Sequence, residues 1–267
     1  MPLSALLRRY DHALIDLDGC LWVGDEPTEG AVDAIAALRG AGKRLAFITN
    51  DARHASEEFV RKLWRLGFQA SLEEVVTVGG ALQHLLAVRR DGASSAFVIG
   101  APPVFRHVQD AGLRILNGTE FASRAEVVVV AGHDDFSYAE LRTATQAILR
   151  GAALIGAGRD PTFPMPDGPW PGTGALLAAV ERATGRGALV VGKPEPPIFE
   201  TALDRLGGGR ALVIGDRLDS DLAGARAAGL DCAIVLTGAT SRADAQGATD
   251  PRPVAVADTL ADLVIGG

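Results

Sequence analysis

The regular alternation of short apolar runs with helix-like segments is the feature that most constrains the fold. The runs 12–17 (HALIDL) and 44–49 (RLAFIT) have the length and composition of buried strands, and 30–38 between them has helical character. A second helix is expected over 56–66, where Gly67 follows as a typical C-terminal glycine. Near-continuous Val/Ile/Leu strands separated by helices are typical of a parallel sheet covered on both faces. The pattern therefore predicts an α/β fold.

The same alternation recurs towards the C-terminus and restarts in the middle of the chain. The later strands are expected at 188–191, 211–214, 232–236 and, as an edge strand, 254–257, with helices at 197–206 and 220–228. The middle region has its own strands at 96–100, 125–131 and 153–156, and helices near 104–111, 137–150 and 174–184. A Pro/Gly-rich loop is expected over 160–172. We predict one α/β domain formed by 1–79 and 187–267, with a second α/β domain inserted at 80–186.

Charge and cysteine content exclude several classes of protein. The chain has 26 Lys+Arg against 33 Asp+Glu, a formal net charge of −7, which disfavours nucleic-acid binding. No apolar run approaches the roughly 18–20 residues of a membrane span, and the first ten residues lack a signal-peptide pattern. Cys20 and Cys232 stand far apart, as suits a reducing compartment. We expect a cytoplasmic protein that binds neither membranes nor nucleic acids.

An acidic pair, Asp16 and Asp18, follows the first predicted strand and precedes Gly19. Ligand sites of open α/β sheets lie at the carboxyl ends of strands, and positions i and i+2 of an extended stretch face the same side. Two such carboxylates require either a cation between them or a proton on one of them. An ionised Asp16 suits a nucleophile and metal ligand, and a protonated Asp18 suits a general acid. The alternative is a plain strand-to-turn aspartate.

A second acidic group follows the predicted strand 211–214. Asp216, Asp219 and Asp221 provide three carboxylates within six residues. Oxygen ligands on a short loop suit a hard cation such as Mg²⁺. Asp219 or Ser220 is equally well positioned to cap the following helix. Capping does not explain Asp216, which lies directly at the strand end.

Two further strand ends carry polar residues. Thr49, Asn50 and Asp51 follow a strand and precede a helix, so they offer a hydroxyl and successive N–H groups to a phosphate, or form a simple helix-entry turn. Lys193, between a glycine and a proline, follows the run 188–191 and is one of only three lysines among the 26 basic residues. Its ammonium group could neutralise a phosphate together with an attacking carboxylate, or simply add surface charge.

Taken jointly, the strand-end motifs D-x-D-G, T-N, G-K-P and G-D-x-x-x-x-D occur in this order over the whole chain. The set resembles the haloacid dehalogenase-like (HAD) phosphohydrolase superfamily. The position of the insertion, together with the segments 192–196 (GKPEP) and 171–177, is similar to the NagD-like, p-nitrophenyl phosphatase branch of subclass IIA. The resemblance implies a Rossmann-like parallel-sheet HAD core with an inserted α/β C2-type cap, in agreement with the partition above.

The resemblance also implies roles for individual residues. Asp16 would be the nucleophile that forms an aspartyl-phosphate, and Asp18 would protonate the leaving group and then activate water. Thr49 and Asn50 would bind the phosphoryl oxygens, while Lys193 would screen their charge. Such an arrangement provides the positioning and charge neutralisation on which phosphoryl transfer depends.

A bound Mg²⁺ ion is part of the same resemblance. Its implied ligands are Asp16, the carbonyl oxygen of Asp18, and Asp216, with Asp221 supporting them from behind. The implied function is a Mg²⁺-dependent phosphatase that acts on a small phosphorylated metabolite. Relatives of this branch often dimerise through the cap, so a homodimer is an expectation that follows from the resemblance alone.

The sequence departs from the family pattern on the substrate side. Many relatives have a second Asn where this chain has Asp51, and a small hydroxylated residue where it has Ala52. The common T-N-P-D of the cap reads Ala-Gly-Arg-Asp at 157–160. Asp51 would disfavour a strongly anionic leaving group and Arg159 would attract one, with Asp160 nearby, so the natural substrate stays open.

Other functions on the same fold remain alternatives. A phosphomutase or phosphotransferase would pass the phosphoryl group to a sugar, although such enzymes usually carry a helical cap after the first motif. A non-catalytic sensor of a phosphorylated ligand would use the same pocket without turnover.

Overall fold

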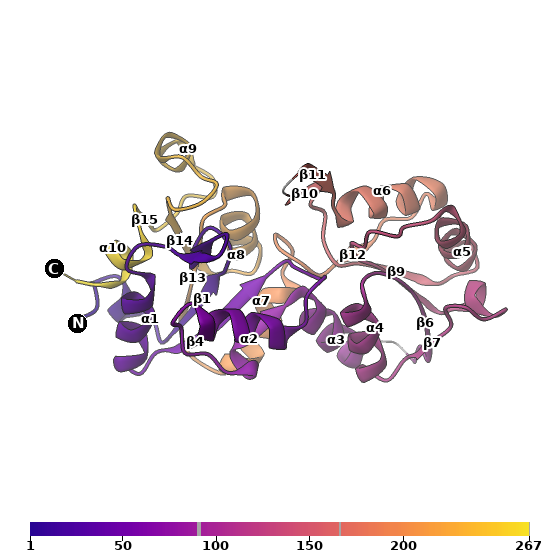
Figure 1. Ribbon diagram of the computed structural model, residues 1–267, viewed down its shortest axis with the longest axis horizontal. Helices are drawn as coiled ribbons and strands as arrows, with labels where there is room; N and C mark the ends of the chain where they lie inside the picture. The colour runs from indigo at the N-terminus through magenta and orange to yellow at the C-terminus, as the bar shows by residue number, and fades with distance from the viewer. Residues whose placement is uncertain (90–91, 166, 267) are drawn as a thin grey trace. The chain divides into compact units, whose positions relative to one another are not determined.

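The computed structural model describes residues 1–89, 92–165 and 167–266. The chain forms two compact units (Figure 1). Unit 1 comprises Met1–Thr49, Ser56–Val76 and Lys193–Gly267, and unit 2 comprises Asn50–Ala55 and Thr77–Gly192. The domain boundaries expected from the sequence, at 79/80 and 186/187, stay a prediction.

Unit 1 is built on a six-stranded sheet with the order β15-β14-β13-β1-β4-β5. β1 pairs in parallel with both β13 and β4, and β14 lies parallel to both β13 and β15. The predicted α/β fold with a parallel sheet is therefore confirmed, including the edge strand near 254–257. The strands are β1 (His12–Asp16), β4 (Arg44–Thr49), β5 (Val75–Thr77), β13 (Ala211–Gly215), β14 (Asp231–Val235) and β15 (Ala255–Ala257).

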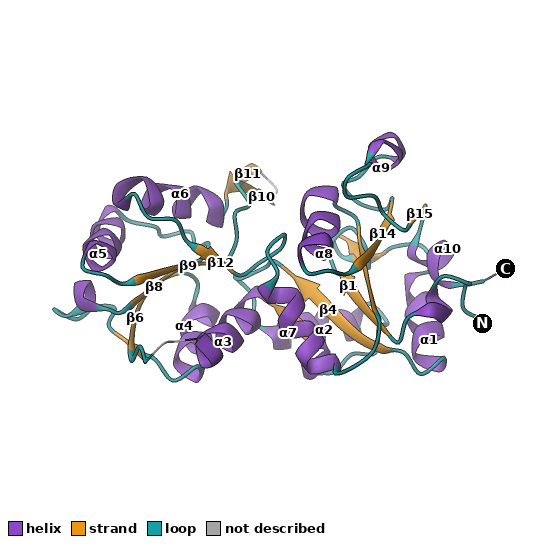
Figure 2. Ribbon diagram, turned by 180° about the vertical axis from the view of Figure 1, so that it is seen from behind, coloured by secondary structure: helices purple, strands orange, loops and turns teal. Residues whose placement is uncertain are grey.

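Helices cover both faces of this sheet because its strands are apolar on both sides. Ala13 and Ile15 of β1 join a core cluster with residues of α1, α2 and α10, whereas Leu14 points to the opposite face and is also fully buried. α7 packs against β1 and β4, and the layers can be followed in Figure 2. The helices are α1 (Ala31–Gly40), α2 (Ser56–Arg65), α7 (Pro197–Leu206), α8 (Ala223–Ala227), α9 (Arg242–Gly247) and α10 (Leu260–Val264).

Shorter elements complete unit 1. A two-stranded antiparallel hairpin, β2 (Trp22–Val23) and β3 (Glu26–Pro27), follows the first strand of the sheet. Two 3₁₀ helices, η1 (Leu7–Arg9) and η2 (Leu72–Glu74), and one π-helix, η4 (Leu218–Leu222), lie in connections. The sequence predicted one continuous helix over 220–228, but the π-turns of η4 precede α8 there. Such π-turns are rare and often mark functional sites.

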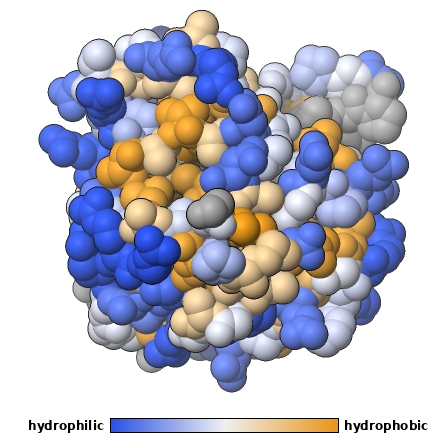
Figure 3. Space-filling model, turned by 90° about the vertical axis from the view of Figure 1, so that its left-hand side faces the viewer, coloured by the Kyte–Doolittle hydropathy of each residue, from blue (hydrophilic) through white to orange (hydrophobic). Residues whose placement is uncertain are grey.

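Residues 2–4 and 264–266 of unit 1 pair with each other. Leu3 and Ile265 form an antiparallel bridge, the Ser4 amide donates to the Val264 carbonyl at 2.8 Å, and the Gly266 amide donates to the Pro2 carbonyl at 2.9 Å. Figure 3 looks onto this end, where hydrophobic side chains lie between hydrophilic ones. These bonds satisfy backbone groups that two free chain ends would leave to water.

Unit 2 has a five-stranded sheet of its own with the order β12-β9-β8-β6-β7, and every pairing in it is parallel. Its strands are β6 (Ser95–Ile99), β7 (Arg114–Ile115), β8 (Val127–Val130), β9 (Ala153–Gly156) and β12 (Leu189–Val190). Side chains from α5 and α6 pack with β8 and β9 in one core cluster. The helices are α3 (Val78–Arg89), α4 (Pro102–Asp110), α5 (Tyr138–Leu149), α6 (Thr173–Thr184) and the 3₁₀ helix η3 (Ala122–Arg124).

Two segments differ from the sequence prediction. The expected loop 160–172 contains an antiparallel hairpin, β10 (Thr162–Met165) and β11 (Gly168–Pro171). Its prolines hide the strand pattern, since they are tolerated only where no ladder bond is needed from their nitrogen. The sequence predicts that the run 188–191 belongs with the strands of the C-terminal half, but its strand β12 pairs with β9 in unit 2. A strand of two residues carries no pattern that could identify its sheet.

Within the described ranges, no helix is both long enough and apolar enough to cross a membrane.

Candidate active site

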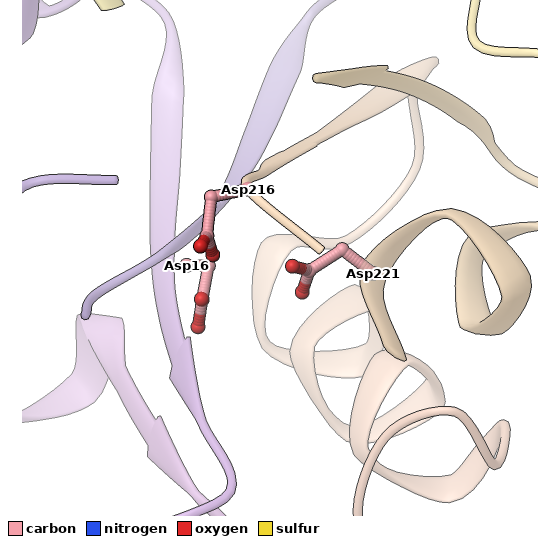
Figure 4. Close-up of side chains that lie close together, drawn as sticks. All are labelled: Asp16, Asp216 and Asp221. Atoms are coloured by element: carbon pink, nitrogen blue, oxygen red, sulfur yellow. The ribbon is translucent and has the colours of Figure 1, made fainter. Parts of the chain in front are cut away.

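Three buried carboxylates meet at the carboxyl ends of two neighbouring strands in unit 1. Asp16 is the last residue of β1, Asp216 follows β13 directly, and Asp221 lies in η4. Because β1 and β13 run parallel with Ile15 opposite Ile214, their ends bring Asp16 and Asp216 together. One oxygen from each carboxylate lies within 4.8 Å of the others, and Figure 4 shows the three groups directed into one small volume.

Lys193 connects two of these carboxylates. Its Nζ donates to Asp16 Oδ1 at 2.6 Å and to Asp221 Oδ1 at 2.7 Å, and only 4% of the residue is exposed. Burial raises the pKa of Asp16 well above its ordinary value, although Lys193 opposes this. Burial alone would lower the pKa of Lys193, but the carboxylates of Asp16 and Asp221 outweigh it and raise that pKa. The lysine is held here as an ammonium ion.

Asp216 is held by the loop that follows β14. Ala239 N–H donates to Asp216 Oδ2 at 2.6 Å, and Thr240 N–H donates to the Asp216 carbonyl at 3.1 Å. A Cβ on Gly238 would lie 2.0 Å from Oδ2, and one on Gly19, whose φ is +81°, would lie 2.5 Å from it. Burial raises the pKa of Asp216, and the Ala239 amide opposes this. The absence of side chains at Gly19 and Gly238 leaves room for this carboxylate, and the Ala239 amide fixes its orientation.

The cluster fits a hard divalent cation. Asp216 Oδ1 is buried and has no hydrogen-bond partner among the described residues, although its other oxygen is bound. Among the described residues, Lys193 is in ion-pair contact with Asp16 and Asp221, and no ion-pair partner is seen for Asp216. Both oxygens of Asp221 accept protein donors, Lys193 Nζ and the Arg217 amide at 3.1 Å, so Asp221 is better suited to support the cluster than to bind an ion. Buried carboxylate oxygens of this kind are ligands for Mg²⁺.

Asp18 has a different environment from Asp16. β1 ends at Asp16, and Leu21 N–H bonds back to the Leu17 carbonyl at 2.8 Å, so the chain has already turned at Asp18. The alternation of side chains along a strand therefore does not extend to this residue. Its carboxylate is exposed, and Oδ1 accepts the indole N–H of Trp22 at 2.7 Å. The structure groups Asp16 with Asp216 and Asp221, and it holds Asp18 by a separate contact.

The T-N-D motif is divided between the two units. Thr49 is the buried last residue of β4 in unit 1, whereas Asn50 and Asp51 cluster with unit 2. Asn50 Nδ2 donates to Asp160 Oδ2 at 3.3 Å within unit 2. Asp51 accepts the amide of Arg53 at 2.6 Å and that of His54 at 3.0 Å, and its Oδ2 lies 2.8 Å from His54 Nδ1. Asp51 is thus the hydrogen-bonding centre of the turn that leads towards α2.

Arg159 and Asp160 support the connection to the hairpin of unit 2. The guanidinium of Arg159 makes a two-pronged contact with Glu181, at 2.9 and 3.0 Å. Hydrogen bonding from Arg159 lowers the pKa of Glu181 despite partial burial, and the Ala188 amide adds to this effect. The Asp160 carbonyl accepts the Gly174 amide at 2.9 Å.

Two contributors to the site were missed at the level of the sequence. One is the segment Thr237–Gly238–Ala239, which follows the predicted strand 232–236. It is a strand end with a hydroxyl and a glycine, so the rule that singled out the other four motifs would have found it. The other is Trp22, which no sequence pattern indicates because its contact with Asp18 depends on a turn.

Comparison with known proteins identifies the family of this chain. The family model for haloacid dehalogenase-like hydrolases matches residues 13–114, and a HAD-hydrolase-like model matches residues 190–263. Human chronophin is 35% identical over 99% of this chain and 95% of its own length. The chain belongs to the haloacid dehalogenase-like hydrolases.

Further relatives place this HAD-like hydrolase in the p-nitrophenyl phosphatase branch. The D-glycerol 3-phosphate phosphatase of Mycobacterium tuberculosis is 37% identical over 91% of this chain and 67% of its own length. A crystal structure of the M. tuberculosis glycerol phosphate phosphatase in complex with magnesium matches with a TM-score of 0.89, covering 98% of this chain and 78% of that one. The p-nitrophenyl phosphatase from Archaeoglobus fulgidus matches with a TM-score of 0.86 at 29% identity, covering 95% and 98%. The family and the fold expected from the motifs are confirmed.

Proposed function

We propose that this HAD-like hydrolase is a Mg²⁺-dependent phosphatase that hydrolyses a small phosphomonoester. The observation that carries the proposal is the buried cluster of Asp16, Asp216 and Asp221 with Lys193 bound across it. Asp216 Oδ1, left without a partner among the described residues, supports a cation there. The related phosphatases, including one crystallised with magnesium, support the same reaction class.

In this proposal the reaction proceeds in two displacements. A carboxylate oxygen of Asp16 attacks phosphorus, the bond from phosphorus to the ester oxygen breaks, and Asp18 gives its proton to the departing alkoxide. Water then attacks the phosphorus of the aspartyl-phosphate, and Asp18 takes up a proton from that water. Inorganic phosphate leaves, and Asp16 is regenerated as a carboxylate.

The remaining residues bind charge. Thr49 and Asn50 hold phosphoryl oxygens, and Lys193 neutralises charge on Asp16 and on the phosphoryl group, as supported by its 2.6 Å contact with Asp16. Asp16, the carbonyl oxygen of Asp18, and Asp216 would hold Mg²⁺. When bound, the ion neutralises phosphoryl charge and orients the displacement. Asp221 fixes Lys193 from the far side.

Unit 2 is the cap in this proposal. Asp51, Arg159 and Asp160 lie on the substrate side in this proposal, and their hydrogen bonds within unit 2 support a role in fixing the shape of two loops. A homodimer through unit 2 is supported by two exposed apolar side chains on one side of α5, Tyr138 at 80% and Leu149 at 63%. Light scattering of the purified protein measures whether it is a dimer. A cytoplasmic location stays a prediction.

The first experiment measures p-nitrophenol release from p-nitrophenyl phosphate with and without Mg²⁺. Wild-type protein should turn over only with the ion, and Asp16→Asn should reduce the rate by more than about four orders of magnitude. A screen over glycolate, glycerol, pyridoxal, sugar and nucleotide monophosphates then identifies the substrate. Turnover in Asp16→Asn equal to that of the wild type would remove the proposal. Phosphate transfer to a sugar in preference to water would establish the phosphotransferase alternative instead.

A further inference from the structure

The turn after β1 brings a fully buried indole against the exposed carboxylate of Asp18. Trp22 is 0% exposed, and its Nε1–H donates to Asp18 Oδ1 at 2.7 Å. Backbone contacts hold the same turn closed. Gly19 N–H donates to the Trp22 carbonyl at 2.7 Å, and Asp18 forms a β-bridge with Trp22. The positive φ of Gly19, +81°, is what allows so tight a turn. The indole therefore has one fixed orientation towards Asp18.

Lys62 lies over the ring face of the same indole. Its Nζ lies 4.5 Å from the centre of the Trp22 ring and donates to the Gly24 carbonyl at 2.9 Å. Gly24 is the tip of the β2–β3 hairpin, so α2 is tied to the hairpin at this point. A neighbouring ion pair, Arg65 to Asp25 at 2.8 Å, adds to the connection. An ammonium over an indole face is the most favourable cation–π arrangement.

We propose that Trp22, held by Lys62, is a positioning residue that determines which oxygen of Asp18 carries the transferable proton. This inference rests on the proposed function, in which Asp18 is the acid and base. An indole nitrogen is a donor only, so it can pair with Asp18 Oδ1 only through a lone pair of that oxygen. The carbonyl oxygen of a carboxylic acid accepts a hydrogen bond more strongly than its hydroxyl oxygen, so the indole bond to Oδ1 favours the form of Asp18 that carries its transferable proton on Oδ2. In the second displacement Oδ2 receives the proton of the attacking water, and the indole bond stays in place throughout.

A purely structural role for Trp22 makes a different prediction. If the indole only filled space, Trp22→Phe would slow all substrates alike. If it orients Asp18, the loss is greatest where the leaving group needs a proton. A p-nitrophenolate ion leaves readily without one, whereas an alkoxide does not. The ratio of the two rates isolates the role.

The experiment measures kcat/KM for glycerol 3-phosphate and for p-nitrophenyl phosphate on one preparation of each protein, with saturating Mg²⁺. This constant covers the steps up to departure of the alcohol, and the ratio is insensitive to the fraction of folded protein. Trp22→Phe should lower the alkyl-to-aryl ratio at least tenfold. Lys62→Met should lower it about threefold, since the indole loses its partner and keeps its N–H.

Lys43→Met is the matched control for the lysine. Lys43 also donates to a backbone carbonyl in unit 1, that of Tyr10, and makes no described contact with Trp22 or Asp18. It should leave the ratio unchanged. In an Asp18→Asn background, Trp22→Phe should have no further effect on the ratio, because both changes remove the same function.

Different results would rule out the proposed function and the role of Trp22. Wild-type protein that hydrolyses neither ester would remove the proposed function. Wild-type turnover of both esters with an unchanged ratio in Trp22→Phe, or an undiminished effect of that change on top of Asp18→Asn, would overturn the role of Trp22. Should Trp22→Phe fail to fold, an unchanged ratio in Lys62→Met overturns it equally.

Discussion

The polar residues of the two units are used in different ways. In unit 1, Asp16, Lys193 and Asp216 are 7%, 4% and 3% exposed, and one buried carboxylate oxygen has no partner within the described chain. In unit 2, the side chains of Arg159 and Asp51 are 48% and 28% exposed and are hydrogen-bonded to their neighbours. A buried charge with incomplete pairing is costly unless a ligand completes it, whereas a partly exposed and paired charge requires none. This contrast supports a catalytic role for the buried cluster of unit 1 and a role in loop shape for Arg159 and Asp51 of unit 2.

The largest expected effect that tests this contrast is that of Lys193→Met. Removal of the ammonium leaves the buried carboxylates of Asp16 and Asp221 facing each other without compensation. We expect turnover to fall about a thousandfold and the free energy of unfolding to fall by about 3 kcal/mol. Mg²⁺ should restore more stability to this variant than to the wild type, because it supplies the missing positive charge.

Urea unfolding of both proteins, with Mg²⁺ and with a chelator, measures this difference. Equal stabilisation of the two proteins by Mg²⁺ would show that the cation and the lysine do not share the same carboxylates.

The next effect concerns the loop that holds Asp216. In Gly238→Ala the added methyl would lie 2.0 Å from Asp216 Oδ2, so the carboxylate must move. We expect Mg²⁺ affinity to weaken by about 10- to 100-fold, as is usual when the support of a metal ligand is disturbed. Titration calorimetry of the metal-free protein measures this without reference to turnover. Gly247→Ala is the control, because a methyl there meets nothing within 4 Å; equal affinities in the two variants would contradict the role of the loop.

The sequence predicts some residues of the candidate site but not others. The strand-end rule found Asp16 and Asp216 because β1 and β13 are adjacent parallel strands, whose ends must meet. Lys193 follows a strand end, as the sequence predicts, but that strand, β12, pairs with β9 in unit 2 and not with the strands that carry Asp16 and Asp216. The contact of Trp22 with Asp18 and that of Arg159 with Glu181 were out of reach. The first depends on a tight turn and the second on two segments 22 residues apart, and neither leaves a periodic pattern.

In unit 2 the ion pair of Arg159 should matter for stability more than for turnover. Glu181→Gln removes one carboxylate charge from a half-exposed pair, so we expect a loss of at most about 1 kcal/mol at pH 7 and less than about a threefold change in kcat. Because Arg159 lowers the pKa of Glu181 below 4.5, the wild-type advantage is present above that pH and disappears as the pH falls through the lowered pKa.

Thermal unfolding of wild type and Glu181→Gln between pH 3 and 7 follows this loss. A tenfold rise in KM caused by Arg159→Ala, with unchanged stability, would instead make Arg159 a direct substrate contact and break the contrast between the units.

The smallest effect is expected for Asp51→Asn. The amide oxygen can still accept the backbone bonds of Arg53 and His54, so the turn is retained. We expect kcat/KM for every phosphomonoester to stay within about threefold of the wild-type value. A selective gain for strongly anionic leaving groups, measured with nucleotide and glycolate phosphates, would show that the charge of Asp51 acts on the substrate directly.

The most direct test of the account is chemical trapping of the intermediate on Asp16. The protein is mixed with substrate and Mg²⁺, quenched within milliseconds, reduced with borohydride and digested for peptide mass spectrometry. Borohydride converts an aspartyl-phosphate to homoserine, so we expect homoserine at position 16. Full turnover with unmodified Asp16, or with the label at another residue, would contradict it.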